Sequence, residues 1–541
     1  MQSDQRAQPP RNGAGRGAGG GIHRRGLIRS AAQLGIGTFV SRLLGLGRDM
    51  SRAWLFGTGT AADAFSVAFR FPNLLRALFA EGALSAAFVP VFTRTLHEGD
   101  RENLEDFLHS FATLLLLTLV GVSLLGVVLA PLVVPWIVAG FEEVPGKIAL
   151  TIRLTQLLFP YILLIGLATL AMGVLNSFGH FAMPALAPAL MNVAMILGVV
   201  VVAPRVAETP ERQIYALAGA VLVGGLLQGL IQLPPLLRRG LRPRFRWAFG
   251  HPGIRKVALL MVPGIFGFAV AEINAFVNLL LASRLEPGSV AALEYGQRVM
   301  QLPLGVFAVA LGTAVLPTLS RQAAAHDFDA LRDTYGFSLR MTWLILIPAS
   351  VLLIVLARPL LMLLFARGAF RTGDSLELTT IALVWFSVGL VAYGSVKSLV
   401  PVFYAQQDTR TPVRCAALSM GANIVLAVAL MGPMRLGGLA LATAAASAIN
   451  VMLLFRETVR RTGIGIPKDL VGAGLRFLLA GGACGVAAYL ANETIPLPLL
   501  PRVLLALAAG GLADLVVLLL LRAEEPRDLL EMLRRRFGRS R

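Results

Sequence analysis

Apolar segments long enough to cross a lipid bilayer follow one another along most of this 541-residue chain. A membrane-spanning helix needs roughly 20 apolar residues, and about 14 such segments fit between Leu27 and Leu521. Charged residues make up only 15% of the chain, whereas a soluble domain averages about 25%. This composition excludes an ordinary soluble enzyme, a disordered protein and a disulfide-stapled secreted domain. The sequence therefore predicts an all-α polytopic membrane protein whose spans form their own helical bundle.

Short loops join the expected spans, and a Gly- and Arg-rich tail that we expect to be disordered precedes them. The spans are 27–56, 60–88, 107–138, 148–175, 183–204, 213–237, 255–283, 290–318, 335–365, 376–403, 412–433, 436–455, 470–491 and 500–521. Both cysteines, Cys415 and Cys484, fall in these apolar segments. We therefore expect neither a disulfide framework nor a thiolate metal site.

Basic residues gather in the loops of one side. These basic segments are 238–256, 456–468 and the C-terminal tail 522–541. Loops 141–146 and 491–501, expected on the opposite side, contain no Lys or Arg, and loop 366–375 is an exception with two arginines. Because cytoplasmic loops carry the excess of Lys and Arg, both termini are predicted to be cytoplasmic.

The net charge of +19 is then a signal of topology. Nucleic-acid binding becomes the weak alternative, because the basic clusters lie at the ends of membrane spans. We also expect them to lack the interleaved aromatic platform that binds single-stranded nucleic acid.

The chain repeats itself with a period of about 227 residues. Pro90–Arg94 closes the second span and Pro317–Arg321 closes the eighth, 227 residues later. Asn176–Pro184 and Tyr404–Pro412 join equivalent pairs of spans, 228 residues apart. Six spans per repeat give two lobes of the same orientation. This predicts a pseudo-twofold axis along the membrane normal and a central cavity between the lobes.

The spans, loops and repeat together predict a domain organisation. We expect a disordered cytoplasmic tail at 1–26, an N-lobe of spans 1–6 at 27–240, a C-lobe of spans 7–12 at 241–465, spans 13 and 14 at 466–522, and a basic cytoplasmic tail at 523–541.

Several charged residues lie inside the predicted spans. A charged side chain at the bilayer centre costs at least ~2.5–3.5 kcal/mol, so such residues should face a wet cavity or one another. Arg48, Arg76 and Arg298 are the strongest candidates for a function, because they lie within apolar helices of both lobes. We expect another group, in contrast, to be end residues that reach the headgroups. This group is Asp49, Arg153 and Arg284.

Arginines in a cavity favour one class of substrate. A guanidinium group stays charged and binds phosphate oxygens with two parallel hydrogen bonds. A proton relay would instead need carboxylates and histidines, and no metal-ligand cluster is present in the sequence. The residues therefore predict a two-lobed transporter with a cationic cavity for a phosphate-bearing substrate.

Long motifs in both lobes resemble those of one family. They are Ser41–Asp49, Ala61–Phe65, Phe69–Gly82, Phe159–Leu163, Leu175–Phe181, Ala187–Asn192, Gln297–Gly305 and Phe403–Pro412. In this order, and over residues 27 to 521, the chain resembles the MurJ (MviN) family of lipid II flippases. That family belongs to the multidrug/oligosaccharidyl-lipid/polysaccharide exporter superfamily.

The resemblance implies 14 helices and a transporter of the bacterial inner membrane rather than an enzyme. Its substrate would be lipid II, the undecaprenyl-diphosphate-linked peptidoglycan precursor. Lipid II would move from the cytoplasmic to the periplasmic leaflet by alternating access, for cell-wall synthesis and cell shape. In such proteins the last two helices line a groove for the polyprenyl tail, which assigns that role to 466–522.

The resemblance also implies the site residues. By motif, the arginines that bind the diphosphate fall on Arg42, Arg48, Arg76 and Arg298. The supporting acidic residues are Asp63 and Glu81, which could hold the arginines when the cavity is empty.

No cofactor or metal is expected. Sodium-binding relatives use acidic and amide residues in spans 7 and 11, where this chain offers Asn278 and Asn423 without a clear carboxylate. Membrane potential or an ion gradient would drive transport. The expected partners are lipid II, membrane lipids and the cell-wall synthesis machinery, with no nucleic acid.

Two alternatives stay open. One is a same-fold exporter of another lipid-linked oligosaccharide or of a drug, although a drug exporter should prefer carboxylates in its cavity. The other is an intramembrane glycosyltransferase or a membrane scaffold. An enzyme should carry an acidic pair on an extramembrane loop, and the longest loops here are short and basic.

Overall fold

The structure, a computed structural model, describes residues 37, 40–76, 84–463, 465 and 469–526. The described residues are mostly helical and contain no β-strand, which confirms the all-α fold. A helix at 40–56 comes first. It is followed by α2 (Thr60–Arg76), α3 (Ser85–His97), α4 (Arg101–Ile137), η2 (Ala139–Glu143), α5 (Lys147–Leu158), α6 (Tyr161–Ser177), α7 (Ala182–Leu197), α8 (Ala203–Val206), α9 (Pro210–Leu230) and α10 (Leu233–Leu237).

The second half repeats this order of elements. It consists of α11 (Pro252–Ala282), α12 (Ser289–Pro303), η4 (Leu304–Ala308), α13 (Val309–Ala324), α14 (Phe328–Val355), α15 (Ala357–Phe365), η5 (Gly368–Arg371), α16 (Ser375–Val388), α17 (Leu390–Ala405) and α18 (Arg410–Thr462). Two further helices, α19 (Leu470–Thr494) and α20 (Leu499–Leu520), end the described chain.

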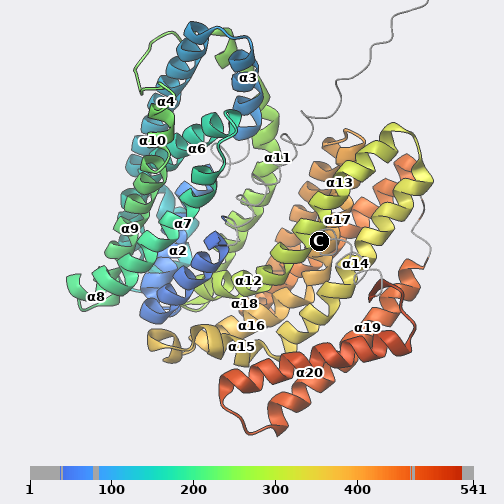
Figure 1. Ribbon diagram of the computed structural model, residues 1–541. Coiled ribbons are helices and arrows are strands. Elements are labelled where there is room, and N and C mark those ends of the chain that lie inside the picture. Colours follow the sequence, from blue (N-terminus) through green and yellow to red (C-terminus); the bar gives the residue numbers. More distant parts are fainter. Residues whose placement is uncertain (1–36, 38–39, 77–83, 464, 466–468, 527–541) are drawn as a thin grey trace, which may run out of the picture.

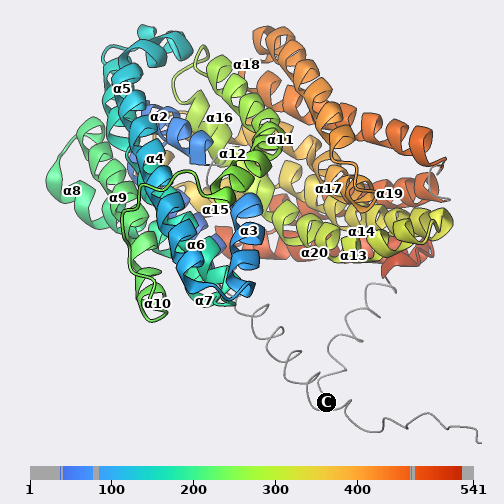
Figure 2. The ribbon, with the colours of Figure 1, turned by 90° about the horizontal axis from the view of Figure 1, so that it is seen from above.

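The helices form two lobes that lie side by side (Figure 1). In the first lobe α2 packs on α5, and α6 and α7 pack on α9. In the second lobe α12 packs on α16, and α13 and α14 pack on α17. The last two helices, α19 and α20, pack on each other and on α14, on the outside of the second lobe (Figures 1 and 2). The predicted two lobes with two additional C-terminal helices are confirmed.

The predicted internal repeat is visible in the element boundaries. The last residues of α3 and α13, His97 and Ala324, lie 227 positions apart. The first residues of α5 and α16, Lys147 and Ser375, lie 228 positions apart. The boundaries of these equivalent helices are therefore offset by the period that the sequence indicated.

Of the described helices, eight are long and apolar enough to cross a membrane, or nine if the bent pair α16 and α17 is one span. Helices α2 and α12 are not among them, because they have only 17 and 15 residues and carry charged side chains. The count of 14 spans stays a prediction. Helix α18 contains the two predicted spans 412–433 and 436–455. Its backbone breaks at Arg435 (φ 47°, ψ −124°), and Ser419 donates a hydrogen bond to the carbonyl of Ala446 across the resulting hairpin.

The structure moves the predicted boundary between the lobes. Leu241, Ile254 and Val257 lie in the apolar core that also contains Phe88 and Phe107 of the first lobe. The start of α11 therefore packs with α3 and α4, and the rest of the helix crosses to pack on α18. A division between the lobes at residue 241 agrees with the sequence repeat but not with this packing.

The two lobes touch at one end of the molecule, which we call the closed end. Loops that the sequence predicts to be periplasmic meet there. The amide of Thr58 donates a hydrogen bond to Ser375 Oγ at 3.1 Å. A Cβ atom placed on Gly140 would lie 2.3 Å from the carbonyl oxygen of Ser283, so the backbones of the two lobes are in direct contact there. Toward the ends of α3 and α13 the two lobes diverge (Figure 1).

Candidate functional site

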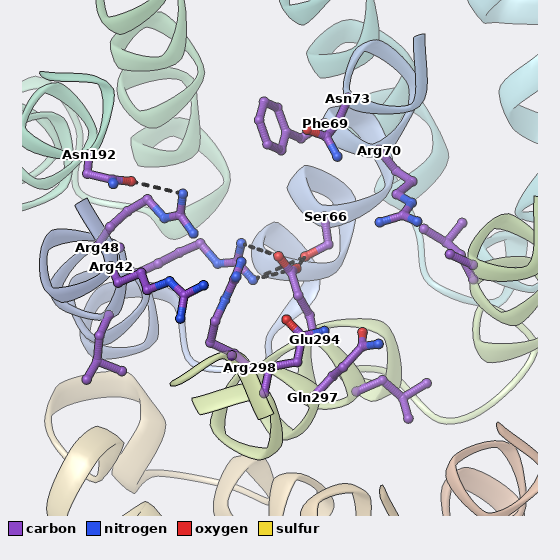
Figure 3. A pocket seen from close by; sticks show the side chains of 18 of the residues that line it. Arg42, Arg48, Ser66, Phe69, Arg70, Asn73, Asn192, Glu294, Gln297 and Arg298 are labelled. Carbon is purple, nitrogen blue, oxygen red and sulfur yellow. Dashed lines mark hydrogen bonds and ion pairs between the residues drawn. The ribbon is translucent and has the colours of Figure 1, made fainter. Parts of the chain in front are cut away.

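A cavity of about 1100 Å³ lies between the two lobes and is lined by residues of both. Its cationic lining residues are Arg42, Arg48, Arg52, Arg70, Arg76, Arg298 and Lys397. Among the described residues the single carboxylate in this lining is Glu294. All four arginines that the sequence predicts to bind the substrate line the cavity, and Figure 3 shows arginines of both lobes pointing into the same space. The cavity is therefore strongly cationic.

Asp49 joins the first helix to α12 beneath this cavity. Arg48 donates hydrogen bonds from Nε and Nη2 to Asp49 Oδ1, at 3.0 and 2.8 Å. Arg298 Nε forms an ion pair with Asp49 Oδ2 at 2.8 Å. Asp49 is only 3% exposed, so the prediction that it is an end residue reaching the headgroups is wrong. One buried carboxylate thus holds an arginine from each lobe.

Arg48 is also positioned from its other side. Its Nη1 donates a hydrogen bond to Asn192 Oδ1 at 3.1 Å (Figure 3). Asn192 Nδ2 in turn donates to the carbonyl of Ser41 at 3.0 Å. Nε, Nη1 and Nη2 of this guanidinium group each donate to an acceptor on Asp49 or Asn192. The fork of Arg48 is therefore preorganised at the cavity wall.

A second cluster of buried polar side chains, centred on Arg52, connects the two lobes. Its guanidinium donates to both carboxylate oxygens of Glu294, at 3.2 and 2.7 Å, and to Tyr295 Oη at 3.1 Å. Ser66 Oγ donates to the same carboxylate at 2.6 Å. Sequence reasoning missed Arg52. The available signal was its position four residues after Arg48, which places both side chains on the same face of a helix.

The repeat explains part of this arrangement. Arg70 of α2 and Arg298 of α12 lie 228 positions apart and are therefore equivalent in the two halves. Arg70 pairs with Glu272 of α11 at 3.1 Å, whereas Arg298 pairs with Asp49 of the first helix. Each arginine thus reaches a carboxylate of the opposite half, as expected around a pseudo-twofold axis.

The remaining predicted arginines lie along the cavity wall. Arg76 Nε donates a hydrogen bond to Asn73 Oδ1 at 3.0 Å. Arg42 extends from the first lobe to the second, since a Cβ atom on Gly305 would lie 2.8 Å from Arg42 Nη1. A glycine at position 305 leaves room for this guanidinium group.

Asp63 is not part of the cavity lining. Its carboxylate accepts hydrogen bonds from Lys147 Nζ at 2.7 Å and from the amides of Gly288 and Ala291, at 2.7 and 2.9 Å, at the closed end of the molecule. The prediction that Asp63 holds the cavity arginines is therefore wrong, because a buried lysine of its own lobe neutralises it. Glu81 lies outside the described residues.

The residues near the predicted amide pair form a neutral cluster. Asn423 Nδ2 donates hydrogen bonds to Asn274 Oδ1 and Asn278 Oδ1, at 2.8 and 2.9 Å, and Asn278 Nδ2 donates to Thr443 Oγ1 at 3.1 Å. The cluster joins α11 to α18 without a carboxylate. Among the described residues no group of three or more His, Cys, Asp or Glu side chains could hold a metal ion. The absence of a sodium site stays a prediction.

Comparisons with known proteins agree on one family. Residues 52–507 match the family described as lipid II flippase MurJ. The chain is 38% identical over 437 residues to the probable lipid II flippase MurJ of Vibrio cholerae serotype O1, covering 80% of this chain and 82% of that protein. It is also 38% identical over 474 residues to the lipid II flippase MurJ of Burkholderia cenocepacia, covering 84% of this chain and 89% of that protein.

Solved structures show the same fold. A lipid II flippase MurJ in an inward closed conformation matches with a TM-score of 0.75 and 26% identity, over 92% of this chain and 99% of that chain. An inward-facing multidrug resistance transporter of the MATE family in the MOP superfamily matches with a TM-score of 0.64 and 16% identity, over 80% and 98% of the two chains. The second likeness shows the fold alone. By its sequence and its structure, this chain belongs to the lipid II flippase MurJ family.

Proposed function

We propose that this protein moves lipid II from the cytoplasmic to the periplasmic leaflet of the bacterial inner membrane, for peptidoglycan synthesis. The observation that carries the proposal is the cavity between the lobes, which has seven cationic side chains and one carboxylate among its described lining residues. Guanidinium groups bind phosphate oxygens with two parallel, charge-assisted hydrogen bonds. A diphosphate linked to a lipid is the ligand that fits both this charge and the family.

The diphosphate competes with Asp49 for the arginines of the two lobes. Arg48 and Arg298 share this one carboxylate in the described state. An anion with more charge and more acceptor oxygens can bind both side chains at once and draw the lobes together. Substrate binding therefore favours an occluded state, because the substrate interacts more strongly with that state than with the open one.

The side of the membrane from which the cavity receives its substrate follows from the position of the closed end. Thr58, Gly140 and Ser375, which make contacts there, lie in loops that the sequence predicts to be periplasmic. Ser283, which contacts Gly140, ends the predicted span 255–283 at the same side. In this orientation both termini are cytoplasmic, and the cavity receives substrate from the cytoplasmic leaflet. Rocking of the lobes then opens the cavity to the periplasm, as in other repeat-based transporters.

The polyprenyl tail stays in lipid, along α19 and α20. These helices pack outside the second lobe and expose large apolar side chains, including Leu478, Leu479 and Leu512. The protein uses no cofactor. Membrane potential can bias the cycle, since moving one charge is worth about 2.3 kcal/mol per 100 mV. The cell-wall synthesis machinery is the expected protein partner.

The test is the leaflet location of lipid II in bacteria whose own flippase can be switched off. We expect the wild-type chain to make lipid II accessible to a degrading enzyme confined to the cell exterior. The variants Arg48→Ala, Arg76→Ala and Arg298→Ala should insert into the membrane normally but should not make lipid II accessible to this enzyme. Arg94→Ala is the matched control, because Arg94 is 71% exposed outside the cavity and pairs with Glu98.

Arg48→Lys refines this test, because it keeps the positive charge but removes the planar guanidinium group that can form two parallel hydrogen bonds. Lysine cannot donate to Asp49 and Asn192 with the geometry of the guanidinium group. We expect flipping to fall about tenfold or more, as the loss of a charge-assisted hydrogen bond predicts. Normal flipping by Arg48→Lys would refute the bidentate account. Insertion of the wild type without exposure of lipid II would instead favour a same-fold exporter of another lipid-linked oligosaccharide.

A further inference from the structure

The segment between α10 and α11 alternates arginines with aromatic residues. Its arginines are Arg242, Arg244 and Arg246, and its aromatic residues are Phe245, Trp247 and Phe249. Residues 241–248 form neither helix nor turn. Phe245 and Trp247 are 75% and 71% exposed. The prediction that the basic clusters lack interleaved aromatic residues is therefore wrong for this segment.

The segment is attached to the first turns of α4, beside which it runs in Figures 1 and 2. His109 Nε2 lies 2.9 Å from the carbonyl oxygen of Arg242 and donates to it in the matching tautomer. The amide of Arg246 donates to Thr113 Oγ1 at 3.0 Å, and the side chain of Arg246 pairs with Asp106. These contacts fix the depth of the segment along α4.

That depth is where α4 enters the bilayer. Residues 101–113 of α4 are rich in charged and polar residues, whereas Leu117 is 43% exposed and begins the lipid-facing apolar surface. Thr113 and Leu117 are separated by four residues, or about 6 Å along a helix. Phe245 and Trp247 therefore lie at the level of the lipid headgroups.

The far end of the segment is also held. His251 stacks on Phe107, with ring centroids 5.2 Å apart, and accepts a hydrogen bond from the amide of Gly253 at the start of α11. His251 Nε2 lies 2.9 Å from Asn103 Oδ1. The segment is thus fixed to α4 at both of its ends. It therefore has little conformational freedom to lose when a ligand binds.

We infer that residues 242–249 form a docking site for anionic phospholipid headgroups of the adjoining leaflet. Tryptophan and other amphipathic rings prefer the membrane interface, and juxtamembrane arginines attract anionic lipids. Phe245 and Trp247 supply the exposed rings. Arg242 and Arg244, which are also exposed, supply the positive charge for the headgroups, whereas Arg246 is paired with Asp106. This inference does not depend on which substrate the cavity carries.

The test measures lipid contact at Trp247 in the purified full-length protein. The protein is placed in nanodiscs of zwitterionic lipid that contain either phosphatidylglycerol or phosphatidylcholine brominated near the top of the acyl chains. Subtracting the emission of Trp247→Phe from that of the wild type isolates the signal of Trp247. We expect the brominated phosphatidylglycerol to quench this signal at a several-fold lower mole fraction than the brominated phosphatidylcholine.

Charge variants then show whether the arginines cause the preference. Arg242→Gln with Arg244→Gln should raise the mole fraction of phosphatidylglycerol needed for half quenching by about fivefold per arginine. Arg456→Gln with Arg460→Gln, exposed on α18 of the other lobe, should leave it unchanged. Equal quenching by the two lipids in the wild type, or an equal loss in the α18 control, would overturn the inference. So would a response of Trp247 to a single-stranded RNA oligonucleotide without a preference for phosphatidylglycerol.

Discussion

Replacement of Asp63 by asparagine should open the closed end of the molecule. Asp63 and Lys147 have side chains that are only 1% and 2% exposed, and their atoms lie 2.7 Å apart. The same carboxylate accepts hydrogen bonds from the amides of Gly288 and Ala291 in the other lobe. Asp63→Asn keeps the shape but leaves the charge of Lys147 buried without its counterion.

The magnitude follows from the difference between the two states. Removing one partner of a buried ion pair costs ~3–5 kcal/mol. When the lobes separate, Asp63 and Lys147 face water, where an ion pair is worth only ~0–1 kcal/mol. The closed end should therefore lose about 3 kcal/mol relative to the open end, which is a little more than a hundredfold in the equilibrium between them.

Disulfide trapping measures this shift. Thr58→Cys with Ser375→Cys places a cysteine on each lobe at the closed end, where the native hydroxyl oxygens are 2.9 Å apart. Cys415 and Cys484, the two native cysteines, are first replaced by alanine. We expect fast crosslinking in this background and much slower crosslinking after Asp63→Asn.

Two further variants decide whether the reasoning is right. Asp63→Asn combined with Lys147→Met should recover part of the crosslinking rate, because a buried apolar side chain needs no counterion. Glu98→Gln, which breaks an exposed pair with Arg94, should have no effect. Crosslinking that stays at the starting rate in Asp63→Asn would show that this buried pair does not hold the lobes together.

Two more predictions concern the cavity and the packing of the second lobe. Glu294→Gln frees the charge of Arg52, so we expect pyrophosphate to bind about tenfold more tightly by calorimetry; unchanged or weaker binding would contradict the electrostatic account. Gly312→Ala would place a Cβ atom 2.6 Å from the carbonyl oxygen of Lys397. It should lower the thermal unfolding temperature, at a cost of ~1–3 kcal/mol. Gly121→Ala, with no atom within 4 Å of the new Cβ, should be neutral or stabilising by up to ~1 kcal/mol, and an equal loss in both variants would refute the packing argument.

Charged residues in apolar helices were a sound guide to the cavity. Arg42, Arg48, Arg76 and Arg298 all line it, because the cost of placing a charge in lipid leaves few other positions for an arginine inside a span. The acidic residues were harder to assign. Nothing local to Asp49 or to its sequence neighbours shows that its carboxylate is buried under the cavity.

The class of fold, the two repeated lobes and the positive charge between them can be predicted from the amino-acid sequence alone. These properties follow from hydropathy, from the repeat period and from composition. All three can be read along the chain without knowing how its helices pack. Which charged side chains pair with each other depends on the packing of the helices. Asp63 pairs with Lys147, 84 positions away, and Arg52 pairs with Glu294, 242 positions away. Such partners are set by how the helices of the two lobes pack, and no local pattern carries that information.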